Sequence, residues 1–185
     1  MSETDFYKYY SGFEQLEGDF LVYFMQESIR LISSEESYSQ YSPKDRMLSF
    51  YFTFFEQLTL NRSLVLYLLD GKKSALPNLK KLWPLRKVYQ HFMSGLGITE
   101  PLMEINNENS EKIEKFRNKG IEEVFWGHLL ATLKFWMEDT SSSFEKTDIF
   151  IEKSLDTSFA LLEVQPLKKI LDLGKFLFKE KFKTN

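Results

Sequence analysis

Aromatic and aliphatic side chains recur at steps of three and four residues over long parts of this sequence. Phe13, Leu16, Phe20 and Phe24 are one such series. This spacing puts the side chains on one face of an α-helix and predicts amphipathic helices. The chain has few glycines and prolines, and most of them fall between the periodic segments, where they end one helix and begin the next. The pattern predicts an all-α protein.

Capping signals set the expected helix boundaries. A serine oxygen at a helix N-terminus accepts an otherwise unpaired backbone N–H, and an acidic side chain three residues later can bond back. The pairs that fit this pattern are Ser2–Asp5, Ser11–Glu14, Ser42–Asp45 and Ser142–Glu145. After a short first helix, the sequence predicts helices at about residues 13–32, 43–60, 62–69, 79–93, 110–137 and 142–164, a polar link at 33–42, a possible interruption near 120 and a last helix from 166.

The composition fits one packed domain and excludes several classes of protein. Hydrophobic residues make up 43% and aromatic residues 16% of the chain, which is too apolar for a disordered protein. The net charge of −3 argues against nonspecific binding to nucleic acid. The chain has no cysteine, no signal-peptide pattern and no run of roughly 20 apolar residues that would span a bilayer. We expect a cytoplasmic protein.

Signatures of catalysis and metal binding are missing from the sequence. The only histidines, His91 and His128, lie far apart, and neither has a glutamate three residues before it. There is no zinc-binding His-Glu-x-x-His pattern, no glycine-rich phosphate loop and no nucleophile elbow. We expect no enzymatic activity, no metal and no cofactor.

The first sixteen residues read Met-Ser-Glu-Thr-Asp-Phe-Tyr-Lys-Tyr-Tyr-Ser-Gly-Phe-Glu-Gln-Leu, a short capped helix followed by the start of a long one. They resemble the recognition helix and following turn of the tetracycline-repressor (TetR) family of bacterial transcriptional regulators. Five positions match that pattern, namely Ser2, Phe6, Tyr7, Tyr10 and Leu16. The resemblance implies a DNA-binding surface made by Ser2, Thr4, Tyr7, Lys8 and Tyr9.

The opening also departs from the family pattern. Thr4 and Asp5 stand where Gly and Thr are usual, and Tyr9 and Phe13 replace a His and a Lys that contact phosphate in the family. A DNA-binding domain of this type needs two further helices, roughly 30 residues, before its recognition helix. We therefore expect residues 1–12 to be a remnant of the helix-turn-helix, which binds DNA only if the missing N-terminal helices are present.

Other segments resemble a Bacteroidetes-type branch of TetR-like regulators. These segments are Ser49–Leu58, Asn61–Ser63, Phe144–Ile149, Glu152–Ser154 and Leu173–Leu177. The resemblance covers nearly the whole chain and implies a TetR-like effector-binding and dimerisation domain over residues 13–185.

TetR-like domains hold a small molecule among their central helices. Aromatic side chains supply apolar area for such a ligand, and Tyr and Trp add a polar tip that can orient it. No cluster of charges accompanies the central aromatic residues, so we expect a small hydrophobic or aromatic effector. The candidate residues are Tyr23, Phe24, Phe50, Tyr51, Phe54, Trp83, Tyr89 and Phe92. The alternative is that each of them only packs in the core.

Two late helices carry the expected dimer surface. Gly127 and Ala131 lie four residues apart and would let another backbone approach closely. The candidate interface residues are Phe125, Trp126, Leu129, Leu133, Trp136, Ile151, Leu155, Phe159 and Leu162. Two antiparallel helices of this kind can pair with their symmetry copies to form a homodimer. The alternative is packing inside one subunit, because core and interface share a composition.

The sequence leaves several functions open. The first is a regulator in which a ligand changes the spacing of two DNA-reading heads. The second is a stand-alone binder or carrier of a hydrophobic small molecule or lipid, and the third is an adaptor that only dimerises. The last helix carries lysines beside phenylalanines and could lie on an anionic membrane, but packing on the body is the commoner arrangement, so we expect no membrane contact.

Overall fold

The computed structural model describes residues 2–69, 82–98 and 108–163. Within these ranges the chain forms seven α-helices, two short 3₁₀ helices and no strand, which confirms the all-α prediction. The helices are α1 (Glu3–Phe6), α2 (Phe13–Ser33), α3 (Pro43–Leu60), α4 (Arg62–Leu68), α5 (Trp83–Ser94), α6 (Glu108–Glu138) and α7 (Glu145–Glu163), with η1 (Glu36–Gln40) and η2 (Ser142–Phe144). The helix predicted from residue 166 lies outside the described residues.

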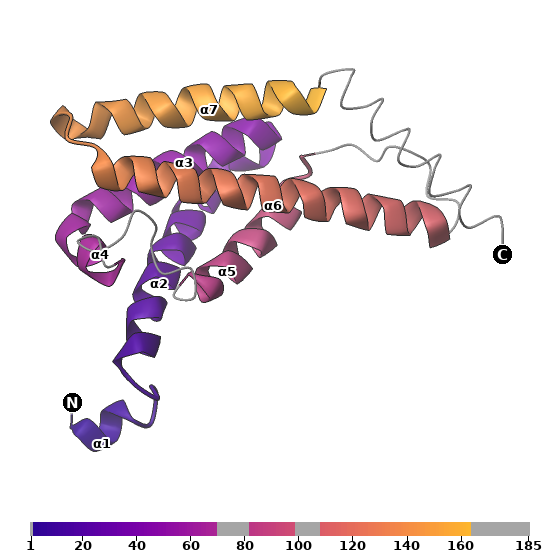
Figure 1. Ribbon diagram of the computed structural model, residues 1–185. Helices are drawn as coiled ribbons and strands as arrows, with labels where there is room; N and C mark the ends of the chain where they lie inside the picture. The colour runs from indigo at the N-terminus through magenta and orange to yellow at the C-terminus, as the bar shows by residue number, and fades with distance from the viewer. Residues whose placement is uncertain (1, 70–81, 99–107, 164–185) are drawn as a thin grey trace.

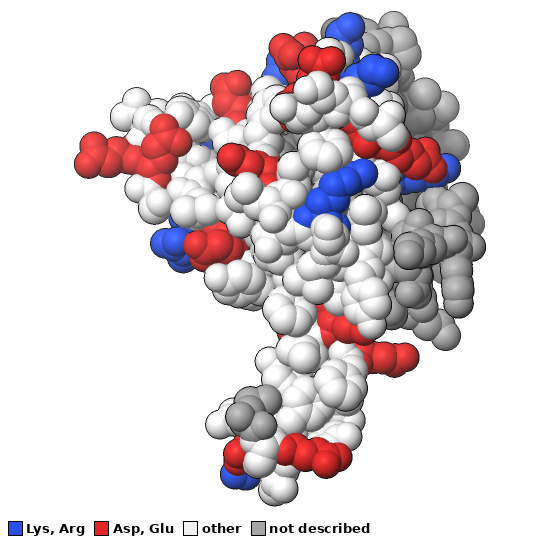
Figure 2. Space-filling view, turned by 90° about the vertical axis from the view of Figure 1, so that its left-hand side faces the viewer, with Lys and Arg blue, Asp and Glu red and all other residues white. Residues whose placement is uncertain are grey.

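The long helices α6 and α7 form an antiparallel hairpin along the upper side of Figure 1. Helix α3 packs against α7, and α5 packs against α6. Helix α2 packs against both α3 and α5 and then extends away from the body toward α1. In Figures 1 and 2, α1 forms the end of a projecting arm, and none of its residues is buried. None of the described helices is long and apolar enough to cross a membrane.

One hydrophobic core holds helices α2 to α7 together. Phe50 lies at its centre, with its ring centroid 5.6 Å from that of Phe54, 5.8 Å from Tyr89 and 4.6 Å from Phe92. Trp136 is fully buried at the end of α6 that lies nearest α4. Burying a large apolar side chain stabilises the fold by about 1.5–3 kcal/mol, so this cluster supplies much of the driving force for folding.

Two of the predicted serine caps are confirmed. Ser2 Oγ accepts the backbone N–H of Asp5 at 3.2 Å, and the Asp5 carboxylate accepts the backbone N–H of Ser2 at 3.4 Å. Ser42 Oγ accepts the backbone N–H of Asp45 at 3.1 Å, with Pro43 in the first turn. The sequence therefore locates the starts of α1 and α3 correctly.

The predicted Ser11–Glu14 cap is wrong. Gly12 is the N-cap residue of α2 and provides no side-chain cap. Ser11 instead donates its backbone N–H to the Gln15 side-chain oxygen at 2.9 Å. Because Ser11 lies one residue before the N-cap, its short side chain pairs with Gln15 and not with the first helical N–H groups.

The predicted Ser142–Glu145 cap is also wrong. Residues Ser142–Phe144 form a 3₁₀ turn, in which Ser143 and Phe144 have positive φ. The N-terminus of α7 is capped from upstream: Ser141 Oγ accepts the N–H of Lys146 at 3.2 Å, and the Asp139 carboxylate accepts the N–H of Thr147 at 3.0 Å. The turn between the helices is short enough for Asp139, directly after α6, to reach the first turn of α7.

Two other features differ from the prediction: helix α6 runs through Gly120 without a break, and the polar link contains η1. Helix α5 begins at Trp83, and the start predicted near residue 79 lies outside the described residues. Pro84 lies in the first turn of α5, where proline fits because its missing N–H has no partner within the helix.

Candidate functional site

Six of the eight predicted effector-binding residues belong to the buried core. These are Phe24, Phe50, Tyr51, Phe54, Tyr89 and Phe92. The other two are more than half exposed: Tyr23 lies on the outer side of α2, and Trp83 lies at the start of α5 beside the guanidinium of Arg86. The structure therefore brings most of the predicted set together as packed aromatic side chains from α2, α3 and α5.

A line of hydrogen bonds crosses this aromatic core. The Tyr89 hydroxyl on α5 lies 3.2 Å from the Tyr51 hydroxyl on α3. The Tyr51 hydroxyl lies 2.8 Å from His128 Nδ1 on α6, and His128 Nε2 lies 2.7 Å from Ser154 Oγ on α7. Four helices are thus connected by polar groups that the sequence separates widely. We call these residues the polar chain.

Two arrangements of protons satisfy the polar chain, one for each tautomer of a neutral His128. In the first, Ser154 Oγ donates to the Phe150 carbonyl oxygen at 2.5 Å and accepts from His128 Nε2–H. His128 Nδ1 is then free to accept from the Tyr51 hydroxyl, whose oxygen accepts from Tyr89. In the second, His128 Nδ1–H donates to Tyr51, Tyr51 donates to Tyr89, and Tyr89 donates to the Phe125 carbonyl oxygen at 3.3 Å, while Ser154 donates to His128 Nε2. His128 is neutral in both arrangements.

Burial sets the titration of these groups. It lowers the pKa of His128 to about 4, so that the imidazole is neutral at physiological pH. Burial also raises the pKa of the Tyr51 and Tyr89 hydroxyls, which keeps both as hydrogen-bond donors. A buried polar group left without a partner costs free energy of folding, so the polar chain fixes the relative positions of the helices that it joins. The sequence showed these residues only as separate aromatic residues and a lone histidine.

The predicted dimer-interface residues point into the subunit. Seven are buried, namely Phe125, Trp126, Leu129, Leu133, Trp136, Ile151 and Leu155, while Phe159 and Leu162 pack partly buried against the core. Trp136 also donates its indole N–H to Thr59 Oγ1 at 2.9 Å. These nine side chains therefore pack inside one subunit, which is the alternative to a dimer interface that the sequence left open.

The outer face of the α6–α7 hairpin carries a different set of apolar residues. Val124, Ile149 and Leu161 are exposed by 63%, 49% and 59%. Phe135 and Phe150 stack on each other with ring centroids 4.6 Å apart. They form part of a groove of about 630 Å³, which is lined by Phe135, Lys146, Ile149, Phe150, Lys153, Ser154, Thr157 and Ser158. We call this the hairpin groove.

The hairpin groove connects with two features described above. Ser154 is both a lining residue of the groove and the end of the polar chain. Gly127 and Ala131 lie exposed on α6, and a Cβ added at Gly127 would meet no other atom within 4 Å. The small side chains predicted to admit another backbone are therefore on the surface of the hairpin.

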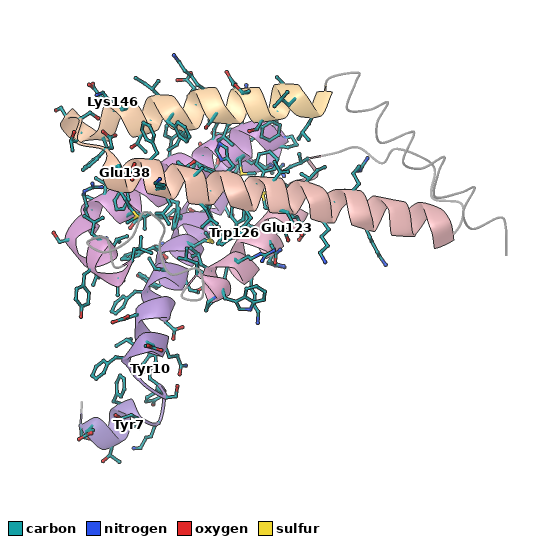
Figure 3. All side chains as sticks on the ribbon, in the orientation of Figure 1. Tyr7, Tyr10, Glu123, Trp126, Glu138 and Lys146 are labelled. Carbon is teal, nitrogen blue, oxygen red and sulfur yellow. The ribbon has the colours of Figure 1, made fainter. Side chains whose placement is uncertain are left out.

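The predicted DNA-binding remnant lies on the projecting arm. Tyr7 and Tyr9 are exposed, Ser2 caps α1, and Lys8 forms an ion pair with Asp5 at 2.8 Å. Thr4 lies exposed within α1. In Figure 3, Tyr7 and Tyr10 lie near the tip of the arm, far from Glu123 and Trp126 on the body.

Aromatic contacts hold the short helix α1 against the start of α2. The Phe6 ring lies 5.4 Å from Tyr10 and 5.0 Å from Phe13.

On the face seen in Figure 2, lysines and arginines are scattered and form no basic patch. Among the described residues, no group of three or more His, Cys, Asp or Glu side chains could hold a metal ion.

Comparison with known proteins identifies the domain. Residues 46–177 match the family model described as "Tetracyclin repressor-like, C-terminal domain". The match starts within α3 and continues beyond α7, so it includes the polar chain and the hairpin groove. No match was found among curated proteins or solved structures. Most of the chain is covered by the family model and the described residues are all-helical, so this chain belongs to the TetR-like family and contains its C-terminal domain.

Proposed function

We propose that this chain is the effector-binding and dimerisation part of a TetR-like transcriptional regulator, and that two copies pair through the outer face of the α6–α7 hairpin. The observation that carries the proposal is the exposed apolar surface of the hairpin groove beside small residues of α6. Membership of the family supports dimerisation and small-molecule binding in general.

The hairpin has the geometry that a symmetric pair requires. Two antiparallel helices from each copy would form a four-helix contact in which the same patch serves both partners. Val124, Ile149 and Leu161 would be covered together with the Phe135–Phe150 pair, while Lys146 and Lys153 would lie toward the rim. Obligate dimer interfaces bury more than about 2,000 Å² and have apolar centres, which fits a contact along much of both helices.

The effector would act on the aromatic core of α2, α3 and α5. The proposed ligand is a small hydrophobic or aromatic molecule that contacts some of the predicted residues by shifting their side chains. Through the polar chain, a change at Tyr51 or Tyr89 would reach Ser154 in the hairpin groove. Such a ligand changes the equilibrium between two arrangements only if it binds them with different affinity.

The arm would connect this domain to DNA. Helix α2 extends from the core to α1, away from the hairpin, so a DNA-reading head would lie on the opposite side from the dimer contact. A recognition helix needs supporting helices to enter a major groove, so DNA binding would require them in addition to α1. The assignment to a Bacteroidetes-type branch remains a prediction from the sequence resemblance.

Cysteine cross-linking tests the proposed pairing. The natural chain has no cysteine, so Gly127→Cys introduces a single thiol on the outer face of α6. If α6 meets its symmetry copy near this residue, mild oxidation gives a disulfide-linked dimer, because disulfides form when Cα atoms lie about 4.4–6.8 Å apart. Ala131→Cys, one turn later, is expected to behave in the same way.

Leu60→Cys serves as the control, since Leu60 is 71% exposed at the end of α3. It is expected to stay monomeric on the same gel. Efficient cross-linking of Leu60→Cys with none at Gly127 or Ala131 would contradict the proposed pairing. A stand-alone carrier needs no such contact, so this experiment also separates the regulator from that alternative.

A further inference from the structure

A second groove, of about 410 Å³, lies between α2 and α5, and it shares no lining residue with the hairpin groove. Gln26 and Ile29 line it from α2, and Lys87, Val88, His91 and Phe92 line it from α5. Phe92 is buried, and its ring lies 4.6 Å from that of Phe50 at the centre of the core. The floor of this α2–α5 groove is therefore the outer side of the aromatic core.

The rim of the α2–α5 groove is polar and carries positive charge. Gln26, Lys87 and His91 are exposed. Within the described parts of the chain, no hydrogen bond or ion pair engages their side chains. None of the described residues that line the groove is acidic. Two nearby carboxylates already have partners, because Glu27 accepts from Arg30 at 2.6 Å and Glu123 pairs with Arg86.

We propose that the α2–α5 groove binds a monoanionic amphiphile, an apolar chain or ring that ends in a carboxylate. The apolar part lies on Ile29, Val88 and Phe92, and the carboxylate lies beside Lys87 and His91 at the rim. The inference deepens the proposed function and rests on it, because it names the chemical class of the effector. The groove volume falls within the range of about 300–1,000 Å³ that is typical of small-molecule sites.

The charge favours this ligand class over a neutral one. The Lys87 ammonium pairs with no other described residue, and beside an apolar floor it can bind the carboxylate without removing it from water. The desolvation cost of a buried ion pair is therefore avoided. An occupant of the groove also touches both α2, which leads to the arm, and α5, which carries Tyr89 of the polar chain. The site is therefore placed where a ligand can affect the relative position of these two helices.

Paired probes test the inference. Octanoate and 1-octanol have the same apolar chain but differ in charge, and their binding to the 185-residue protein can be measured by calorimetry. Octanoate is expected to bind saturably and more tightly than 1-octanol. Lys87→Met keeps the apolar stem and removes the charge. It is expected to weaken the affinity for octanoate about fivefold, the upper range for an exposed ion pair, and to leave the affinity for 1-octanol unchanged.

Two further variants separate the site from general effects of charge and folding. Lys119→Met removes an exposed lysine of α6 outside the groove and is expected to leave both probes unaffected. Gln26→Trp places a large side chain into the groove from an exposed position and is expected to weaken both probes, with an unchanged helical circular-dichroism spectrum.

The two histidines report where the probe binds. His91 lines the α2–α5 groove, while His128 belongs to the polar chain. In ¹H–¹³C spectra of the imidazole rings, octanoate is expected to shift the His91 signals saturably. Absence of saturable binding, a shift confined to His128, or no effect of Lys87→Met on octanoate would overturn the inference.

The mass of the protein, measured in parallel, separates this inference from the proposed function. A dimer that fails to bind octanoate overturns only the ligand class and its site. A monomer that binds octanoate at His91 supports the site and overturns only the proposed pairing.

Discussion

The guanidinium carbon of Arg62 lies 4.5 Å from the ring centroid of Trp136. It also lies 4.4 Å from the Phe144 ring, so that the cation is placed between two aromatic rings. Arg62 donates to the carbonyl oxygens of Trp136 at 2.9 Å and Met137 at 3.0 Å. The last carbonyls of a helix have no partner within it, so Arg62 caps α6 and joins α4 to the turn of the hairpin.

Replacement of Arg62 by Met is expected to destabilise the protein by about 2 kcal/mol, because it removes the cation–π contacts and leaves helix-end carbonyls without their partner. Urea unfolding measures this difference. Arg30→Met is the control: the Arg30 side chain is exposed and pairs with Glu27, and its replacement is expected to change stability by less than about 1 kcal/mol. Equal losses in the two variants would show that Arg62 does not hold the turn.

Asp139 is expected to make stability depend on pH in the acid range. Burial alone would raise its pKa, but hydrogen bonds from Ser141 and Thr147 outweigh this effect and lower the pKa of Asp139 to about 2. The ordinary value is about 3.9, so the unfolded chain takes up the proton first as the pH falls. The stabilisation is therefore complete above about pH 4 and is lost between about pH 4 and pH 2.

The variant Asp139→Ala tests this cap at neutral pH. It is expected to lower the free energy of unfolding, measured in urea, by about 1–2 kcal/mol, as is usual for a lost N-terminal cap. Glu152→Ala, an exposed change within α7, should have little effect. A loss that is no larger for Asp139→Ala than for Glu152→Ala would exclude the capping role.

His128 is expected to contribute a second pH dependence at higher pH. Burial lowers its pKa to about 4 in the folded state, against an ordinary value of about 6.5. Its neutral form thus stabilises the fold fully above about pH 6.5, and this contribution falls as the pH drops toward 4, by at most about 3 kcal/mol. Unfolding curves at pH 7.5 and pH 4.5 would measure the change.

The other histidine provides the comparison for this effect. His128→Phe should flatten the pH dependence between these two values, whereas His91→Phe should keep it, because His91 is exposed. If both variants behaved like the natural protein, neutral His128 would not be a source of the pH effect.

Removal of one hydroxyl from the polar chain is expected to be costly. Tyr51→Phe deletes the hydroxyl that bonds to His128 Nδ1 and leaves this nitrogen without its partner, which should cost about 1–3 kcal/mol. Tyr67→Phe makes the same chemical change at a side chain that is 72% exposed and should be nearly neutral. Thermal or urea unfolding of the pair gives the difference, and a neutral Tyr51→Phe would show that the polar chain contributes no stability.

The sequence predicts the helices well because their signals are local. The three- and four-residue spacing of aromatic residues and the Ser2 and Ser42 caps depend only on neighbours in the chain. The cap on α7 could not be found in this way, since Asp139 reaches it through the tight turn that follows α6. A rule that looks for serine three residues before an acid selects Ser142 instead.

The functional surface is less predictable for a physical reason. Large apolar residues of α6 and α7 satisfy the spacing of a core and of an interface equally well, and only the folded chain shows that Trp136 and Ile151 point inward. The polar chain joins residues that are 26 to 77 positions apart, so no local pattern reveals it. The exposed Gly127–Ala131 pair was predicted because small residues four apart share one face of a helix.

Sedimentation equilibrium of the purified protein, with Ile149→Lys and Leu60→Lys beside it, tests the central claim most directly. Ile149 lies in the hairpin groove, while Leu60 is exposed elsewhere. The account predicts a mass twice that of the 22.0 kDa chain for the natural protein and for Leu60→Lys, and the mass of one chain for Ile149→Lys. A natural protein that sediments as a single chain at every concentration, or an Ile149→Lys variant that stays paired, would contradict it.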